Sequence, residues 1–223
     1  MRLASLTKAQ LDPEQLDLYQ RILGGPRASG PQHFALTDRS GALVGPFGIM
    51  LHAPALGRPL QDLGAAIRYR TGLSARVREI AILSVAVATG SAFERYAHKR
   101  VGRAVGLTDE ELADLDQGRF ASDDQAEATA YALCDRLNHG PVPLTDEEFA
   151  DMRTRLGDAA ILELVVLVGY YRTLSQLLHV FDVGAPPEDD SETGGVTPRV
   201  PEGQAAAAAS AEEREMKRKD QDA

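Results

Sequence analysis

Residues 73–106 read LSARVREIAILSVAVATGSAFERYAHKRVGRAVG and predict two helices joined at Gly90-Ser91. Ser74 is a favourable N-cap for the first helix, and residues 77–88 are apolar almost all round, which is typical of a helix buried within a bundle. Gly90 is a favourable helix end, and Ser91 is a favourable cap for the helix that follows. The stretch therefore predicts an all-α core built around one buried helix.

Three polar side chains in this stretch are candidates for chemistry. Glu79 comes just before the apolar run, and Glu94 and His98 are four residues apart, so they share one face of the second helix. If the helices fold back at Gly90, Glu79 lies about 16 Å from the corner and His98 about 10–12 Å, at 1.5 Å rise per residue. The difference is within the reach of the two side chains. We therefore expect a Glu79, Glu94 and His98 cluster at the crossing of the two helices.

The same segment resembles the signature of the carboxymuconolactone decarboxylase and alkylhydroperoxidase (AhpD-like) family. Residues 76–98 carry the pattern R-x-R-E-x-A-I-L…G-S-x-F-E-x-x-x-H. A weaker likeness extends over residues 44–183, including LHAP at 51–54 and VGYYR at 168–172. The resemblance implies an AhpD-like multi-helix bundle, a small-molecule substrate, no cofactor, and a homo-oligomer, either a trimer or a hexamer.

The peroxidase branch of that family carries two cysteines where this chain has Ser91 and Glu94. Without a cysteine pair for disulfide exchange, thiol peroxidase activity is not expected. The chain resembles the decarboxylase-type branch instead, which implies that the catalytic residues are His98, Glu94 and Glu79. An imidazole titrates near neutral pH, so His98 is the best candidate for general acid/base catalysis.

Further residues are candidates for holding the substrate. The resemblance places two histidines in the pocket walls, and the cationic side chains near the motif could attract an anion. The candidate substrate-binding residues are Arg76, Ser91, Arg95, Lys99, His52 and His179. The family often has a tryptophan where this chain has Arg95, so the substrate stays open.

These residues also have structural interpretations. Glu94 and His98 could form an ordinary i, i+4 contact. Glu79 could be a first-turn glutamate favoured by the helix dipole, although the apolar run after it favours burial and a raised pKa. His52 and His179 lie in apolar contexts and could be packing residues. The three candidate catalytic residues could in principle ligate a metal, but no known zinc-motif spacing is present, so no metal is expected.

Composition and charge limit the class of protein. The formal net charge of -9 argues against nucleic-acid or anionic-membrane binding as the main task. Cys134 is the one cysteine among 223 residues, so no intrachain disulfide can form and a reducing compartment fits. The N-terminal residues have no apolar stretch of signal-peptide length, and the longest apolar run, near residues 80–88, is too short to cross a bilayer. We expect a soluble cytoplasmic protein.

The rest of the chain also indicates helices. A first helix is expected from Pro13, capped by Asp12, to Gly24-Gly25, followed by a long wrapping loop over residues 26–48 and a short helical turn over 47–52. Apolar spacing predicts a helix over 59–69 and a last helix from Asp158 to Phe181. Three capping boxes are expected, which are Thr108 to Glu111, Ser122 to Gln125 and Thr145 to Glu148.

The composition changes after Gly184. The following residues are acidic, rich in proline and alanine, and poor in large apolar side chains, which predicts disorder. The expected organisation is one AhpD-like helical domain over residues 1–184 and a disordered acidic tail over 185–223.

The sequence leads to one preferred function and two alternatives. The preferred function is a cofactor-independent lyase of the carboxymuconolactone decarboxylase type, which uses His/Glu proton transfer on a small or aromatic-derived carboxylate or lactone, as in aromatic catabolism. One alternative is a repurposed family member that catalyses an isomerisation or cyclisation in secondary metabolism. The other is a non-catalytic, oligomeric small-molecule-binding protein.

Overall fold

Eight α-helices and two short 3-10 helices form the computed structural model over the residues that it describes, which are 1–28, 31–140 and 143–186. In chain order the elements are η1 (Lys8–Gln10), α1 (Pro13–Gly24), η2 (Pro26–Ala28), α2 (Gly45–Met50), α3 (Pro54–Tyr69), α4 (Ala75–Thr89), α5 (Ala92–Ala104), α6 (Asp109–Asp116), α7 (Gln125–Asn138) and α8 (Asp146–Val180). Extended pairing within the described residues is an isolated antiparallel bridge between Thr37 and Leu43. The all-α prediction is therefore confirmed.

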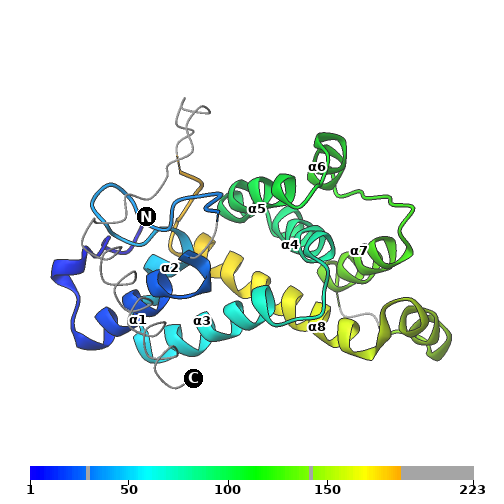
Figure 1. Cartoon of the computed structure of the whole chain (residues 1–223), viewed down its shortest axis with the longest axis horizontal. Helices are drawn as coiled ribbons and strands as arrows, with labels where there is room; N and C mark the ends of the chain where they lie inside the picture. Colours follow the sequence, from blue (N-terminus) through cyan, green and yellow to red (C-terminus); the bar gives the residue numbers. More distant parts are fainter. Residues whose placement is uncertain (29–30, 141–142, 187–223) are drawn as a thin grey trace, which may run out of the picture. The chain divides into compact units, whose positions relative to one another are not determined.

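Helix α4 is the buried element on which the other helices pack, and it contacts α5, α6, α7 and α8 (Figure 1). Every residue from 79 to 86 is buried, as the all-round apolar pattern predicts. On one side, Ile80 and Leu83 pack against leucines of α6 and of the turn before it. On the other side, Ile82 and Val85 belong to the main core, shared with α1, α7 and α8. Each fully buried Ile or Leu side chain contributes about 1.5–3 kcal/mol, so α4 anchors the fold.

The corner between α4 and α5 forms where the sequence predicts it. The Ser74 hydroxyl accepts a hydrogen bond from the Val77 backbone N–H at 3.1 Å, and Gly90 ends α4 with φ 70°. The predicted side-chain cap at Ser91 is wrong. The Ser91 hydroxyl is buried and makes no hydrogen bond within the described residues, whereas the Ser91 backbone N–H donates to the Ala86 carbonyl at 2.9 Å. The backbone alone therefore closes the turn.

Two of the three predicted capping boxes are present. The hydroxyls of Thr108 and Thr145 each accept a hydrogen bond from the backbone N–H three residues later. The carboxylate of the glutamate at that position accepts a hydrogen bond from the backbone N–H of the threonine. The box expected at Ser122 is wrong. Asp124 caps α7 instead, because its carboxylate accepts from two backbone N–H groups at the helix start, and the Ser122 hydroxyl donates to Glu127.

Helix boundaries differ from the prediction where proline and glycine occur within a helix. Helix α3 begins at Pro54 rather than near residue 59, and Pro59 lies inside it on an exposed position, where a missing N–H is tolerated. The predicted helix from Asp158 is the second segment of α8. A preceding segment from Asp146 meets it at Gly157, whose φ of 79° and ψ of 160° interrupt the helical geometry.

The loop after α1 is more ordered than its composition indicates. Helix α1 and its Asp12 cap agree with the prediction. The expected turn over residues 47–52 begins earlier, because α2 starts at Gly45. Gly45 has φ 62°, and a Cβ placed there would lie 2.2 Å from a ring atom of Phe93. A side chain at this position would therefore push α2 away from α5.

Two predictions about the whole chain have different outcomes. The predicted disordered tail falls, beyond Pro186, outside the described residues, so the boundary at 184 stays a prediction. Among the described helices, α8 is long and apolar enough to span a membrane by length and composition, contrary to the expectation from the sequence. Half of its most apolar window is buried inside the structure, and one such helix is weak evidence for a membrane span.

We predict that Gly90→Ala lowers the free energy of unfolding by about 1–2 kcal/mol, because a side chain strains the left-handed backbone there. No heavy atom lies within 4 Å of a Cβ built at Gly90 or at Gly169, so steric contact contributes at neither site. Gly169 lies within α8, so Gly169→Ala is the matched control and should stabilise by about 0.5–1 kcal/mol. Urea unfolding measures both changes, and equal effects at the two sites would contradict the role of Gly90.

Candidate active site

Helices α4 and α5 bring Glu79, Glu94 and His98 together where the two helices cross. Nδ1 of His98 lies 2.6 Å from Oε2 of Glu79, and Nε2 lies 3.4 Å from Oε2 of Glu94. The three residues are 1%, 3% and 3% exposed, for Glu79, Glu94 and His98 respectively. The imidazole therefore lies between two buried carboxyl groups, one on each helix.

The Glu79 carboxylate fixes the orientation of the imidazole. Burial acts to raise the Glu79 pKa, but the charge and hydrogen bond of His98, with Arg68 and Arg78, outweigh burial and lower it. The rise expected from the apolar run is therefore wrong. An ionised carboxylate can only accept, so Nδ1–H of His98 donates to Glu79. In the neutral ring this leaves Nε2 as a proton acceptor that faces Glu94.

Glu94 has the opposite electrostatic character. Burial raises its pKa, and the opposing positive charges of His98, Arg68 and Arg27 do not overcome this effect. Its Oε1 is buried and has no hydrogen-bond partner within the described residues. Burial therefore shifts Glu94 towards the neutral carboxyl form, and in that form it could donate a proton either to Nε2 of His98 or to a bound molecule.

A small cavity of about 20 Å³ lies against this group. Its walls come from η2, α2, α3, α5, α8 and the loop before α2, and its lining residues are Arg27, Phe34, Pro46, Phe47, Arg68, Phe93, Glu94, Ala97, His98, Tyr170, Tyr171 and Leu174. A cavity of this size holds about one water molecule, so a substrate can enter only when side chains move. The rings of Tyr171 and His98 are perpendicular, with centroids 5.3 Å apart, so that Tyr171 packs against the imidazole.

Two arginines in the cavity wall were not identified from the sequence. Arg68 on α3 lies 3.9 Å from Oε1 of Glu79, and Arg27 on η2 donates through Nε to Gln61 at 3.0 Å. For Arg68 the sequence offers one indication, because Arg68 directly follows Ile67, an apolar residue of the predicted helix. For Arg27, which precedes a long loop, the local sequence offered no such signal.

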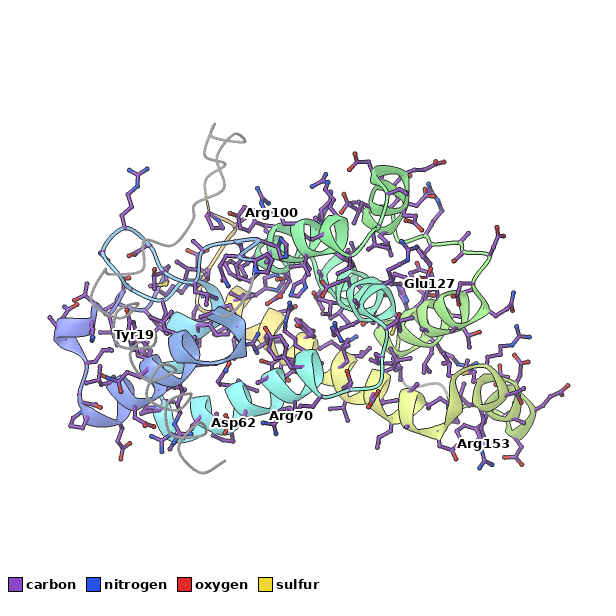
Figure 2. The ribbon with its side chains drawn as sticks, viewed as in Figure 1. Tyr19, Asp62, Arg70, Arg100, Glu127 and Arg153 are labelled. Carbon is purple, nitrogen blue, oxygen red and sulfur yellow. The ribbon has the colours of Figure 1, made fainter. Side chains whose placement is uncertain are left out.

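Three predicted substrate-binding cations lie in other ion pairs. Arg76 contacts Glu111 and Glu127 at 2.6 Å each, and so joins α4 to α6 and α7. Figure 2 labels Glu127 on α7. Arg95 and Lys99 both pair with Asp116 on α6. None of the three cations lines the cavity. Each of them instead forms an ion pair between two helices.

The other predicted wall residues also lie outside the cavity lining. His52 is exposed and its Nε2 lies 3.0 Å from the Ala4 carbonyl. His179 is exposed and 3.4 Å from the Gly90 carbonyl. Ser91 is buried at the corner of α4 and α5. Of the nine predicted site residues, the structure brings together the three candidate catalytic residues.

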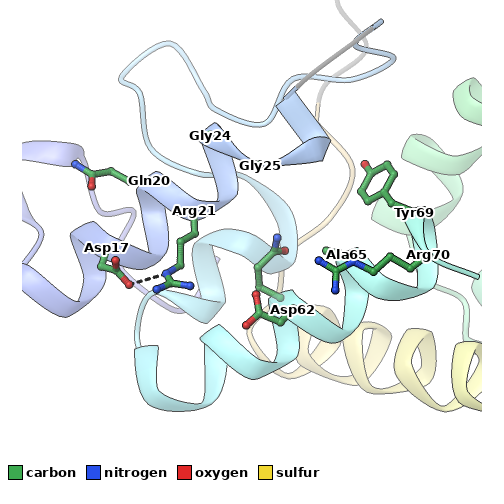
Figure 3. Close-up of a pocket in the computed structure, with 10 residues that line it drawn as sticks. Asp17, Gln20, Arg21, Gly24, Gly25, Asp62, Ala65, Tyr69 and Arg70 are labelled. Atoms are coloured by element: carbon green, nitrogen blue, oxygen red, sulfur yellow. Dashed lines mark hydrogen bonds and ion pairs between the residues drawn. The ribbon is translucent and has the colours of Figure 1, made fainter.

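A larger groove of about 530 Å³ opens between α1 and α3 (Figure 3). Asp17 and Arg21, one turn apart on α1, pair at 2.8 Å along one wall of the groove, and Gln61, Asp62 and Arg70 also line it. The groove contains no histidine and does not include Glu94 or His98. The candidate catalytic residues Glu94 and His98 therefore line the smaller cavity and not the larger groove.

The described residues contain no group of three or more His, Cys, Asp or Glu side chains placed to hold a metal ion. Cys134 is buried in α7, and burial raises the pKa of its thiol to about 12. A thiol in this state carries little thiolate at neutral pH and is a poor nucleophile.

The two glutamates predict opposite effects of pH on stability. Glu79, with its pKa lowered from 4.5, stabilises the fold above pH 4.5, and this stabilisation is lost as pH falls through the folded pKa. Glu94, with its pKa raised from 4.5, contributes stability below pH 4.5, and this is lost as pH rises through the folded pKa. Relative to wild type, Glu79→Gln should therefore become less stable as the pH rises from the folded pKa of Glu79 towards 4.5. Glu94→Gln should become more stable as the pH rises from 4.5 towards the folded pKa of Glu94.

Urea unfolding over a pH series measures these differences, with each variant serving as the control for the other. If the difference in stability between each variant and wild type did not change with pH, the assigned directions of the two pKa shifts would be contradicted.

Comparison with known families agrees with this geometry. Residues 54–135 match the model of the carboxymuconolactone decarboxylase family, and this segment contains Glu79, Glu94 and His98. Arg27 and Tyr170 lie outside it. No curated protein matches the chain. With one cysteine in the chain there is no cysteine pair, as in the decarboxylase-type branch. Residues 54–135 therefore belong to the carboxymuconolactone decarboxylase family, in the form without redox cysteines.

Proposed function

We propose that the protein is a cofactor-independent decarboxylase that acts on a small carboxylate or lactone by proton transfer. The observation that carries this proposal is the buried Glu94 carboxyl, whose Oε1 has no partner within the described residues and whose Oε2 contacts His98. His98 is held from its other nitrogen by Glu79. Such an arrangement can keep a proton available in a site almost closed to water.

The chemistry needs few groups. Loss of CO₂ from an acid β or vinylogous to a carbonyl leaves an enolate, and the site must stabilise that charge and return a proton to carbon. Glu94 in its neutral form would give its proton to the carbon and become a carboxylate. Nε2 of His98 would then take a proton from a water molecule and pass it to Glu94, which restores both groups and leaves a hydroxide that combines with the released CO₂. Glu79 would stabilise the imidazolium formed during this exchange. Arg68 and Arg27 would supply positive charge near the departing carboxylate and the enolate.

The same proton shuttle would also serve an isomerisation or a cyclisation, which is the alternative enzyme proposal. The two differ in whether CO₂ is released. A thiol peroxidase is disfavoured by the buried, high-pKa Cys134 and by the absence of a second cysteine. Assembly as a homo-oligomer, a cytoplasmic location and a place in aromatic catabolism remain parts of the proposal that rest on the family.

We predict that His98→Ala lowers kcat by about 10²–10⁴-fold, the usual contribution of general acid/base catalysis. CO₂ release from a panel of β-keto acids, vinylogous acids and lactone acids measures this loss, with circular dichroism as the check on folding. Glu94→Gln should also lower kcat, and the double variant should be little worse than His98→Ala, because the two residues act as one unit.

His139→Ala is the matched control. His139 is exposed at the end of α7, where it contacts the Asp135 carbonyl, so its loss should leave turnover unchanged. Full turnover by His98→Ala would end the catalytic assignment. Product formation without CO₂ would favour the isomerase alternative.

A further inference from the structure

Arg27 differs from Arg68, the other arginine that lines the cavity, in having no acidic partner within the described residues. Across residues 1–28, 31–140 and 143–186, no carboxylate lies within 4.0 Å of its guanidinium, whereas Arg68 lies 3.9 Å from Glu79. The Arg27 guanidinium lies over the Phe47 ring, 5.0 Å from its centroid, and its Nε donates to Oε1 of Gln61 at 3.0 Å. Arg27 also lines the cavity.

A second polar group meets Arg27 at the same place. The Tyr170 hydroxyl is buried and has no partner with full hydrogen-bond geometry within the described residues, and Tyr170 itself is 4% exposed. The Arg27 guanidinium lies close enough to act against the rise that burial causes in the pKa of Tyr170. A Cβ built on Gly64 would lie 2.1 Å from this hydroxyl and 2.7 Å from Nη2 of Arg27. The missing side chain of Gly64 therefore leaves the space in which a guanidinium edge and a phenol converge. Two donors at one point form a site for an anion.

The charge balance of the cavity also favours an anion. Glu79 compensates Arg68, with which it forms an ion pair. Glu94 forms no ion pair with Arg27 among the described residues, and burial raises the pKa of Glu94 against the opposing charges of His98, Arg68 and Arg27. His98 lies between the two glutamates, and Tyr170 and Tyr171 are the remaining titratable groups in the lining. Of the two arginines that line the cavity, Arg27 is therefore the one without an ion-pair partner among the described residues.

We propose that Arg27, positioned by Gln61 and assisted by the Tyr170 hydroxyl, binds the carboxylate of a small, ring-bearing monocarboxylate beside Glu94 and His98. The planar guanidinium matches a carboxylate, to which it can donate two parallel hydrogen bonds. A ligand with two or more negative charges would lie unfavourably near the ionised Glu79. Only the identification of this ligand as the substrate rests on the proposed function; the binding itself does not.

The cavity walls specify the rest of the ligand. Phe34 and Phe93 pack edge-to-face with centroids 6.4 Å apart, and Phe47 forms a third aromatic wall. A flat apolar ring fits between such side chains. The cavity now holds about one water molecule, so the ligand must displace a wall residue. Arg27 is suited to move, because Gln61, its partner, also lines the open groove between α1 and α3.

Direct binding tests this proposal without turnover. The probes are benzoate and its neutral isostere benzamide, titrated calorimetrically into the full chain. Benzoate should bind at least about 10-fold more tightly than benzamide, because a charge-assisted hydrogen bond is stronger than a neutral one. Arg27→Gln should abolish that preference. Gln61→Glu should do so as well, because it gives Arg27 an internal carboxylate in place of the amide oxygen.

Arg21→Gln is the matched control, since Arg21 lies nearby on α1 but pairs with Asp17. It should leave the preference for benzoate intact. Equal binding of the two probes by wild type, no binding of either, or an unchanged preference in folded Arg27→Gln would each overturn the proposal. If Arg27→Gln fails to fold, Gln61→Glu decides alone. Arg27-dependent benzoate binding without decarboxylation of any acid would leave this proposal standing and contradict the proposed function.

Discussion

The hydrogen bond between His98 and Glu79 is the contact on which the reactive group depends. It joins Nδ1 to Oε2 at 2.6 Å, and Glu79 is 1% exposed. A carboxylate removed from water costs several kcal/mol unless charged and hydrogen-bonding groups compensate it. His98 on α5 and Arg68 on α3 supply that compensation. The ionised Glu79 therefore requires α3, α4 and α5 to pack in one arrangement, and that arrangement also positions the imidazole.

The raised pKa of Glu94 follows from its burial with few compensating contacts. Glu94 is as deeply buried as Glu79, but its contact with His98 is longer, at 3.4 Å, and its Oε1 has no partner within the described residues. Two carboxyl groups on either side of one imidazole therefore have pKa values shifted in opposite directions. Such a difference assigns one group to hold the ring and the other to exchange a proton. In the proposed reaction, Arg27 would then hold the substrate's negative charge.

The sequence predicts the part of the site that is local. The buried helix, the Gly90 corner and the i, i+4 pair of Glu94 and His98 follow from periodicity and helix-end chemistry within one stretch, and the length estimate across the corner adds Glu79. The sequence does not predict which charges face the cavity. Arg76, Arg95 and Lys99 lie near the motif in sequence, but acidic side chains on α6 and α7 pair with them. Arg27 and Tyr170 reach the cavity through tertiary packing, which periodicity cannot reveal.

The most direct test of this account is the protonation of the His98 ring, observed by nitrogen-15 NMR of the histidine side chains at neutral pH. The account predicts that Nδ1 of His98 carries a proton and donates it to Glu79. The exposed His139 provides an internal reference for a solvated imidazole. A His98 ring that carries its proton on Nε2 and none on Nδ1 would contradict the account. Rapid exchange between the two tautomers of His98 would contradict it as well.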